Sequence, residues 1–177
     1  MSDAKSLELA DYIRSIPDFP KQGILFRDVT PLLASPKAFR SAVGQLADHY
    51  RNQSIDLIAT AEARGFLFAA PLALELNVGL VPIRKPGKLP YEKHSYTYEL
   101  EYGSDTLEMH ADAVTSGARV LVVDDLLATG GTVEACCHMV EKAGGTVAGC
   151  AFIVELGGLG GLEKLADYDV FSLVKYS

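Results

Sequence analysis

The stretch that most constrains this chain is an apolar run that ends in two acidic residues and a glycine-rich turn. Residues 119–133 read RVLVVDDLLATGGTV, with Asp124 and Asp125 directly after the run. An apolar run of this kind is typical of a strand that is buried on both faces. Small and hydroxyl residues follow at 128–132, and the apolar period then becomes helical. The pattern predicts a strand, an acidic pair, a loop and a helix, in that order.

The loop in this pattern is suited to binding a phosphate group. Its backbone N–H groups can converge on one point, at the positive end of the dipole of the following helix. A second glycine-rich stretch, residues 157–161, lacks the GxGxxG spacing of a dinucleotide-binding loop, so no dinucleotide role follows from it.

Apolar segments elsewhere alternate between strand and helix. Ser35 and Pro36 predict the start of a helix, as N-cap and first helical residue. Further helices are expected within residues 3–16 and 66–76, with Pro71 bending the second or marking a late start. Strands are expected at residues 55–60, 78–83, 147–154 and 168–174. This alternation predicts an α/β fold: a Rossmann-like, mostly parallel central sheet flanked by helices.

Residues 96–110 predict a hairpin beside this sheet. Residues 96–102 alternate as a strand does, and residues 106–110 form its partner around a turn at 103–105.

Length and charge limit the classes of function. A chain of 177 residues is expected to form a single domain. Its net charge of −7 argues against a general nucleic-acid or membrane-surface binder. The three cysteines lack metal-ligand spacing and are expected to be buried thiols in a reducing compartment, the cytoplasm. The four histidines likewise show no ligand spacing, and no apolar run approaches the length of a membrane span.

Two basic features lie near the expected phosphate loop. Arg64 follows a predicted strand, where it is either a salt-bridged residue at a helix start or a ligand for phosphate oxygens. Residues 84–93 carry four cations against Glu92 alone, and their prolines exclude a regular helix. This basic loop is either a solvated surface loop or part of an anion site. Phe26 also has two interpretations: a core anchor, or a flat wall for an aromatic ligand.

Residues 122–132 resemble the phosphoribosyl-diphosphate (PRPP) binding signature of the type I phosphoribosyltransferases. Further segments, at 18–20, 23–28, 62–66, 84–90 and 100–103, are similar to the members of that family that act on adenine. The resemblance runs from about residue 18 to the last strand. It implies the type I phosphoribosyltransferase fold, with residues 1–34 as a small N-terminal base-binding segment and residues 84–110 as a basic loop and lid hairpin, within one domain over residues 1–177. It also implies transfer of the phosphoribosyl group from PRPP to N9 of adenine, giving AMP and pyrophosphate in purine salvage.

The resemblance assigns expected roles to individual residues, which fall into five groups. The 5′-phosphate is expected on Ala128, Thr129, Gly130, Gly131 and Thr132, and the ribose on Asp124 and Asp125. Pyrophosphate is expected on Glu62, Ala63, Arg64, Arg84, Lys85 and Lys88. Adenine is expected between Phe26 and Leu126, with main-chain groups of Leu25 and Arg27 reading its edge, and Glu101 is the expected catalytic, proton-handling residue.

Three further expectations follow from the resemblance. Mg²⁺ is expected to reach the acidic pair through PRPP and water, with no certain direct ligand. The peptide bond near Glu62–Ala63 is expected to be non-proline cis or otherwise unusual. The protein is expected to be a homodimer in which the basic loop reaches across the interface, with adenine and PRPP as its partners and neither nucleic acid nor membrane.

Three alternatives remain at this point. A salvage enzyme for xanthine, hypoxanthine or guanine would share the PRPP loop but should lack the Phe26 and Glu101 patterns. A non-catalytic PRPP- or nucleotide-sensing regulator should carry a DNA-binding appendage or a basic face, and neither is visible. A purely structural subunit would have no need for Arg64, Glu101 and the acidic pair together.

Overall fold

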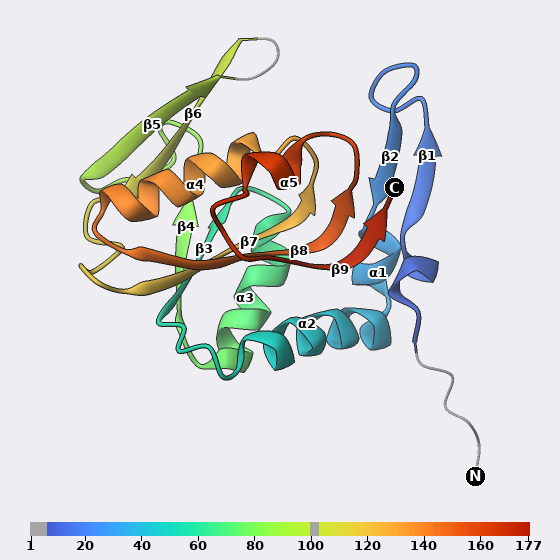
Figure 1. The fold of residues 1–177 in the computed structure, drawn as a ribbon, viewed down its shortest axis with the longest axis horizontal. Helices are drawn as coiled ribbons and strands as arrows, with labels where there is room; N and C mark the ends of the chain where they lie inside the picture. Colours follow the sequence, from blue (N-terminus) through green and yellow to red (C-terminus); the bar gives the residue numbers. More distant parts are fainter. Residues whose placement is uncertain (1–6, 100–102) are drawn as a thin grey trace.

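The computed structural model describes residues 7–99 and 103–177, and its centre is a parallel sheet of five strands (Figure 1). Their order across the sheet is β4-β3-β7-β8-β9, and every neighbouring pair is parallel. The strands span Leu57–Ala61 (β3), Gly79–Ile83 (β4), Arg119–Leu127 (β7), Thr146–Leu156 (β8) and Val170–Tyr176 (β9). The predicted α/β fold with a mostly parallel sheet is confirmed.

Helices cover both faces of the sheet, which explains why its strands are continuously apolar. Helices α2 (Pro36–Tyr50) and α3 (Gly65–Leu76) lie on one face, and α4 (Gly131–Lys142) lies on the other (Figure 1). Alternate side chains of β7 enter different cores: Leu121 packs with the α2–α3 side, and Val122 packs with the α4 side. The predicted helix start is confirmed, since Ser35 Oγ accepts a hydrogen bond from Ala38 N at 3.3 Å. Helix α3 begins at Gly65 and runs through Pro71, so a late start at the proline is wrong.

The N-terminal segment differs from the predicted helix over residues 3–16. Its described part forms a 3₁₀ turn (η1, Leu9–Tyr12) and a strand (β1, Arg14–Pro17), which pairs antiparallel with β2 (Leu25–Asp28). Pairing with β2 satisfies the backbone of β1, and that long-range pairing outweighs the local helical spacing of the apolar residues. A short helix, α1 (Thr30–Ala34), then leads into α2. Figure 1 shows this two-stranded unit standing beside the end of β9.

The predicted hairpin is confirmed in its described residues. Strands β5 (Lys93–Glu99) and β6 (Ser104–His110) pair antiparallel and project away from the sheet (Figure 1). A last short helix, α5 (Gly161–Lys164), follows the glycine-rich stretch after β8 and was not expected from the sequence. Over residues 7–99 and 103–177, no helix has the length and apolar character needed to cross a membrane.

The packing of α2 on the sheet gives a test of the core. Leu46 lies on the buried face of α2 and is fully buried, whereas its neighbour Gln45 is exposed. Leu46→Ala should lower the free energy of unfolding by about 2–5 kcal/mol, because it removes buried methyl groups and leaves a cavity. Gln45→Ala should change it by less than about 0.5 kcal/mol. Urea unfolding of both variants measures the difference, and equal stabilities would contradict the placement of α2.

Candidate active site

The residues predicted to bind phosphate, ribose and pyrophosphate gather at one edge of the sheet, because all five strands are parallel and their carboxyl ends meet there. From β4 to β8, four connections leave this edge side by side. The basic loop follows β4, the Glu62–Arg64 turn follows β3, the phosphate loop follows β7 and the glycine-rich stretch follows β8. The order of the strands therefore places two candidate anion sites next to each other.

The phosphate loop joins β7 directly to α4, as predicted. Residues 128–130 form the loop, and Gly130 adopts φ +81°, a left-handed conformation that favours glycine, just before α4 begins at Gly131. A pocket of about 100 Å³ lies here, lined by Asp124 and residues 126–133. The loop thus has the form expected of a phosphate site at the N-terminus of a twelve-residue helix.

The acidic pair lies within β7 rather than after it. Asp124 Oδ1 accepts a hydrogen bond from Asp125 N at 2.8 Å, and Asp125 Oδ2 pairs with Arg64 Nε at 2.9 Å. Asp125 is buried, while Asp124 is surrounded by protein atoms and open to the pocket on one side. Of the two interpretations of Arg64, the salt bridge is therefore confirmed, although 44% of its side chain is exposed, which leaves donors free for an anion.

Burial raises the pKa of both carboxyl groups. For Asp124 the negative charge of Asp125 adds to this rise, and the backbone N–H of Asp125 and the charge of Arg64 oppose it only in part. For Asp125 the strongest opposing influence is Arg64. Ionising both carboxyl groups together therefore requires a higher pH than usual, and a bound cation would favour that ionisation.

Gly65 allows the ends of β3 and β7 to approach each other. A Cβ atom at this position would overlap Thr60 Oγ1 and lie 2.8 Å from Asp124 Oδ1. Glycine at the first residue of α3 is therefore needed for the acidic pair to lie against the Glu62–Arg64 turn.

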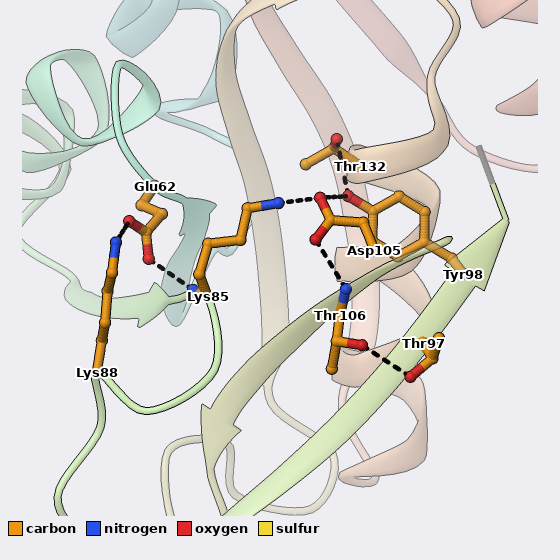
Figure 2. Close-up of polar contacts among 8 residues, drawn as sticks. All are labelled: Glu62, Lys85, Lys88, Thr97, Tyr98, Asp105, Thr106 and Thr132. Carbon is orange, nitrogen blue, oxygen red and sulfur yellow. Dashed lines mark hydrogen bonds and ion pairs between the residues drawn. The ribbon is translucent and has the colours of Figure 1, made fainter. Parts of the chain in front are cut away.

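The Glu62–Arg64 turn contains the predicted unusual bond, since the Glu62–Ala63 peptide is cis. The Glu62 carboxylate faces the basic loop, where it accepts a hydrogen bond from Arg84 Nε at 3.1 Å. It also accepts one from Lys85 N at 2.5 Å and pairs with Lys88 Nζ (Figure 2). Burial alone would raise the pKa of Glu62, but these hydrogen bonds outweigh it and lower the pKa to about 2. The Glu62 side chain therefore holds the basic loop in place, and of this residue only the backbone is left as a contact for an anion.

A hydrogen-bonded chain that the sequence did not reveal links the basic loop to the phosphate loop. Lys85 Nζ pairs with Asp105, whose Oδ2 accepts a hydrogen bond from Tyr98 OH at 3.4 Å, and Tyr98 OH lies 3.2 Å from Thr132 Oγ1 (Figure 2). Tyr98 and Asp105 are directly paired residues of the hairpin. The alternating pattern of residues 96–102 predicted this strand, but nothing local indicated that one tyrosine would reach the phosphate loop.

The expected base-binding residues lie on β2 and β7. Phe26 belongs to neither buried core, so its interpretation as a core anchor is wrong, and Arg64 Cζ lies 5.4 Å from the centre of its ring. Leu126, at the mouth of the pocket, is partly buried. Leu25 is exposed, and the Arg27 guanidinium lies 3.7 Å above the ring of Tyr176 at the end of β9. The interpretation of Phe26 that remains is a flat wall for an aromatic ligand, beside the Glu62–Arg64 turn.

The two remaining expectations concern the catalytic residue Glu101 and the Mg²⁺ ion. Glu101 lies outside the described residues. In the described ranges, no group of three or more histidine, cysteine, aspartate or glutamate side chains is arranged to hold a metal ion. Two neighbouring carboxylates alone fit a Mg²⁺ ion that keeps most of its oxygen ligands from substrate and water.

The raised pKa of Asp124 predicts a pH-dependent gain in stability for Asp124→Asn. The unfolded chain releases this proton near the ordinary value of 3.8, whereas the folded protein keeps it to higher pH. Wild-type protein therefore loses stability as pH rises towards the raised pKa, by up to about 1.4 kcal/mol per pH unit. The variant lacks this loss, so its stability relative to wild type should grow between about pH 5 and 7 in urea unfolding. Asp112→Asn, at an exposed aspartate, is the control, and parallel curves for all three proteins would refute the prediction.

Comparison with known proteins agrees with this geometry. The family model described as the phosphoribosyl transferase domain matches residues 28–176. The chain is 58% identical over 169 residues to the adenine phosphoribosyltransferase of Maridesulfovibrio salexigens, with 96% of this chain and 99% of the relative covered. The relative from Rhodopirellula baltica, which carries the same name, is 55% identical over 170 residues, with 96% of this chain and 82% of the relative covered.

Solved structures agree as well. The crystal structure of adenine phosphoribosyltransferase from Thermoanaerobacter pseudethanolicus superposes with a TM-score of 0.92 at 56% identity, covering 95% of this chain and 98% of that one. The enzyme from Saccharomyces cerevisiae, complexed with an imino-altritol bisphosphate and adenine, gives a TM-score of 0.88 at 41% identity, covering 93% and 96%. The parallel sheet, the phosphate loop after β7 and these matches over nearly the whole chain lead to one conclusion: the chain belongs to the adenine phosphoribosyltransferases of the phosphoribosyl transferase domain family.

Proposed function

We propose that this protein transfers the 5-phosphoribosyl group of PRPP to N9 of adenine, which yields AMP and pyrophosphate, as a step of purine salvage. The observation that carries the proposal is the arrangement at the carboxyl edge of the sheet. The phosphate loop and acidic pair of β7 lie beside the arginine turn of β3, which suits a substrate with a phosphate at one end and a pyrophosphate at the other. Relatives of 53–58% identity carry the name of this activity.

The phosphate loop and the acidic pair would hold the ribose 5-phosphate part of PRPP. Backbone N–H groups of residues 128–132 and the hydroxyls of Thr129 and Thr132 would bind the 5′-phosphate. Asp124 and Asp125 would accept hydrogen bonds from the ribose hydroxyls. As carboxylates they would also stabilise the positive charge that develops on the ribose when its bond to pyrophosphate breaks.

Pyrophosphate would be bound by the cations and backbone at the ends of β3 and β4. Arg64 keeps exposed donors next to the acidic pair, and Arg84, Lys85 and Lys88 lie on the neighbouring loop. Mg²⁺, near Asp124 and Asp125 but bound mainly through PRPP and water, would neutralise pyrophosphate charge as this group leaves.

Adenine would bind between Phe26 and Leu126, with main-chain groups of Leu25 and Arg27 reading its edge. The stacking of Arg27 on Tyr176 fixes β2 against the end of the sheet and thereby positions this reading strand. Glu101, which lies between β5 and β6 in the sequence, would handle the proton at the base. We further propose one catalytic domain over residues 1–177, with residues 1–34 as its base-binding segment and residues 84–110 as its basic loop and lid. Its three cysteines are buried free thiols, which suits the cytoplasm.

A purified-protein assay with PRPP and Mg²⁺ tests the proposal. Pyrophosphate release should be rapid with adenine and slow with hypoxanthine, guanine and xanthine, which offer an oxygen where adenine offers an amino donor. Release with none of the four bases would overturn the enzymatic proposal, and preference for an oxo-purine would overturn the assignment of the base.

Glu101→Gln separates proton handling from substrate binding. We expect kcat to fall by about a hundredfold or more, because general acid–base catalysis is lost, while KM for PRPP changes by less than about threefold. Glu99→Gln is the matched control, since Glu99 is an exposed residue two positions earlier. Steady-state kinetics distinguish the two, and wild-type turnover in Glu101→Gln would refute the role.

The proposed homodimer has a candidate surface on α3. Leu74 is 84% exposed and Leu67 is 47% exposed, on a helix that also borders an open groove lined by Phe39 and Pro71. Exposed leucines beside such a groove favour burial against a second copy. Leu74→Glu should convert the dimer to monomer in sedimentation velocity, whereas Leu159→Glu, at an exposed leucine elsewhere, should not. A wild-type protein that is monomeric and active would contradict both the dimer and a basic loop shared across it.

A further inference from the structure

The glycine-rich stretch at residues 157–161 meets the phosphate loop at its last residue, Gly161. It leads into α5, which Figure 1 shows next to the end of α4 where the phosphate loop arrives. The proposed reaction assigns no role to this stretch, and its spacing excludes a dinucleotide-binding loop. Gly161, however, contacts residues that line the proposed 5′-phosphate pocket.

The contact between Gly161 and the phosphate loop is one of main chain on main chain. A Cβ atom at residue 161 would overlap the carbonyl oxygen of Ala128 and lie 2.9 Å from Leu127 Cδ1. In the opposite direction, a Cβ atom at Gly130 would lie 3.1 Å from Gly161 O and 3.3 Å from Gly161 Cα. Gly161 has no positive φ, so a side chain there is excluded by space rather than by backbone conformation.

The α5 turn is anchored beside the loop by one buried side chain and by an ion pair to α4. Leu165, directly after α5, is fully buried in the same core as Leu127 and Val133. Lys164 Nζ pairs with Glu134 Oε2 of α4 at 3.2 Å, and Leu165 N donates to Gly161 O at 3.2 Å. A side chain at residue 161 would therefore push α5 and the phosphate loop apart.

We propose that Gly161 is a positioning residue for the 5′-phosphate loop. By bringing α5 into main-chain contact with Ala128 and Gly130, it fixes how far the loop's backbone N–H groups stand from the phosphate. The pocket is only about 100 Å³, so a small displacement lengthens several N–H···O hydrogen bonds at once. This inference rests on the proposed function, because it assumes that the loop binds the 5′-phosphate of PRPP and of AMP.

Gly161→Ala and Gly158→Ala form a matched pair that tests this role. Gly158 lies in the same stretch at φ +75° with no atom within 4 Å of an added Cβ, so its alanine variant introduces strain without contact. In Gly161→Ala, KM for PRPP and Kd for AMP should rise by about tenfold or more, while Kd for adenosine and kcat at saturating PRPP change by less than about threefold. In Gly158→Ala, all four quantities should stay within about threefold of wild type.

The outcomes separate the inference from the proposed function. If wild-type protein converts adenine and PRPP to AMP but the two alanine variants behave alike, the positioning role of Gly161 is refuted and the proposed function stands. A loss of adenosine affinity equal to the loss of AMP affinity also refutes it, since a general disturbance would then explain the effect. A wild-type protein with no turnover refutes the proposed function itself.

Hydrogen exchange on wild-type protein keeps the inference testable if Gly161→Ala does not fold. AMP should slow exchange of the Lys164 and Leu165 amides, which donate to Gly160 and Gly161 behind the loop, whereas adenosine should not. Unchanged exchange at these amides with AMP would overturn the inference.

Discussion

Asp124 and Asp125 lie at the end of a strand that is buried on both faces, where an uncompensated negative charge would cost several kcal/mol. Three features make the pair tolerable: the Arg64 ion pair, the Asp125 N–H donated to Asp124, and a raised pKa that lets one proton remain. Because Arg64 comes from the turn after β3, its ion pair with Asp125 ties the carboxyl end of β3 to that of β7. Gly65, which has no side chain, allows the two strand ends to lie close together. The site therefore depends on an electrostatic requirement that the neighbouring parallel strands β3 and β7 satisfy.

Features with a local cause could be predicted from sequence, and features with a distant cause could not. The apolar run before Asp124, the glycine turn after it and the Ser35–Pro36 helix start each act within a few residues, and each is found where it was expected. Residues 9–16 have helical spacing, yet β1 forms because β2 pairs with it. The contact of Tyr98 with Thr132 and that of Gly161 with Ala128 join residues more than thirty positions apart, so no local pattern records them.

The net charge of −7 does not indicate the local charge at this site, because several cations are concentrated at one edge of the sheet and each is paired there with a carboxylate. Arg64 is bound to Asp125, Lys85 to Asp105, and Lys88 to Glu62. The carboxylates keep these side chains oriented and limit mutual repulsion among the cations. An anionic substrate must therefore compete with carboxylates already on the protein, and it gains only the difference between the two interactions.

These pairings connect the hairpin to both candidate anion sites. Asp105 pairs with Lys85 of the basic loop, and its partner Tyr98 contacts Thr132 at the start of α4. Tyr98 has a single hydroxyl proton to share between Asp105 and Thr132. Under the proposed function, a 5′-phosphate that accepted the Thr132 hydroxyl proton would favour donation from Tyr98 to Thr132, and Asp105 would then lose that donor. Occupation of one proposed anion site would thereby change the hydrogen bonding at the other, through two side chains of the same hairpin.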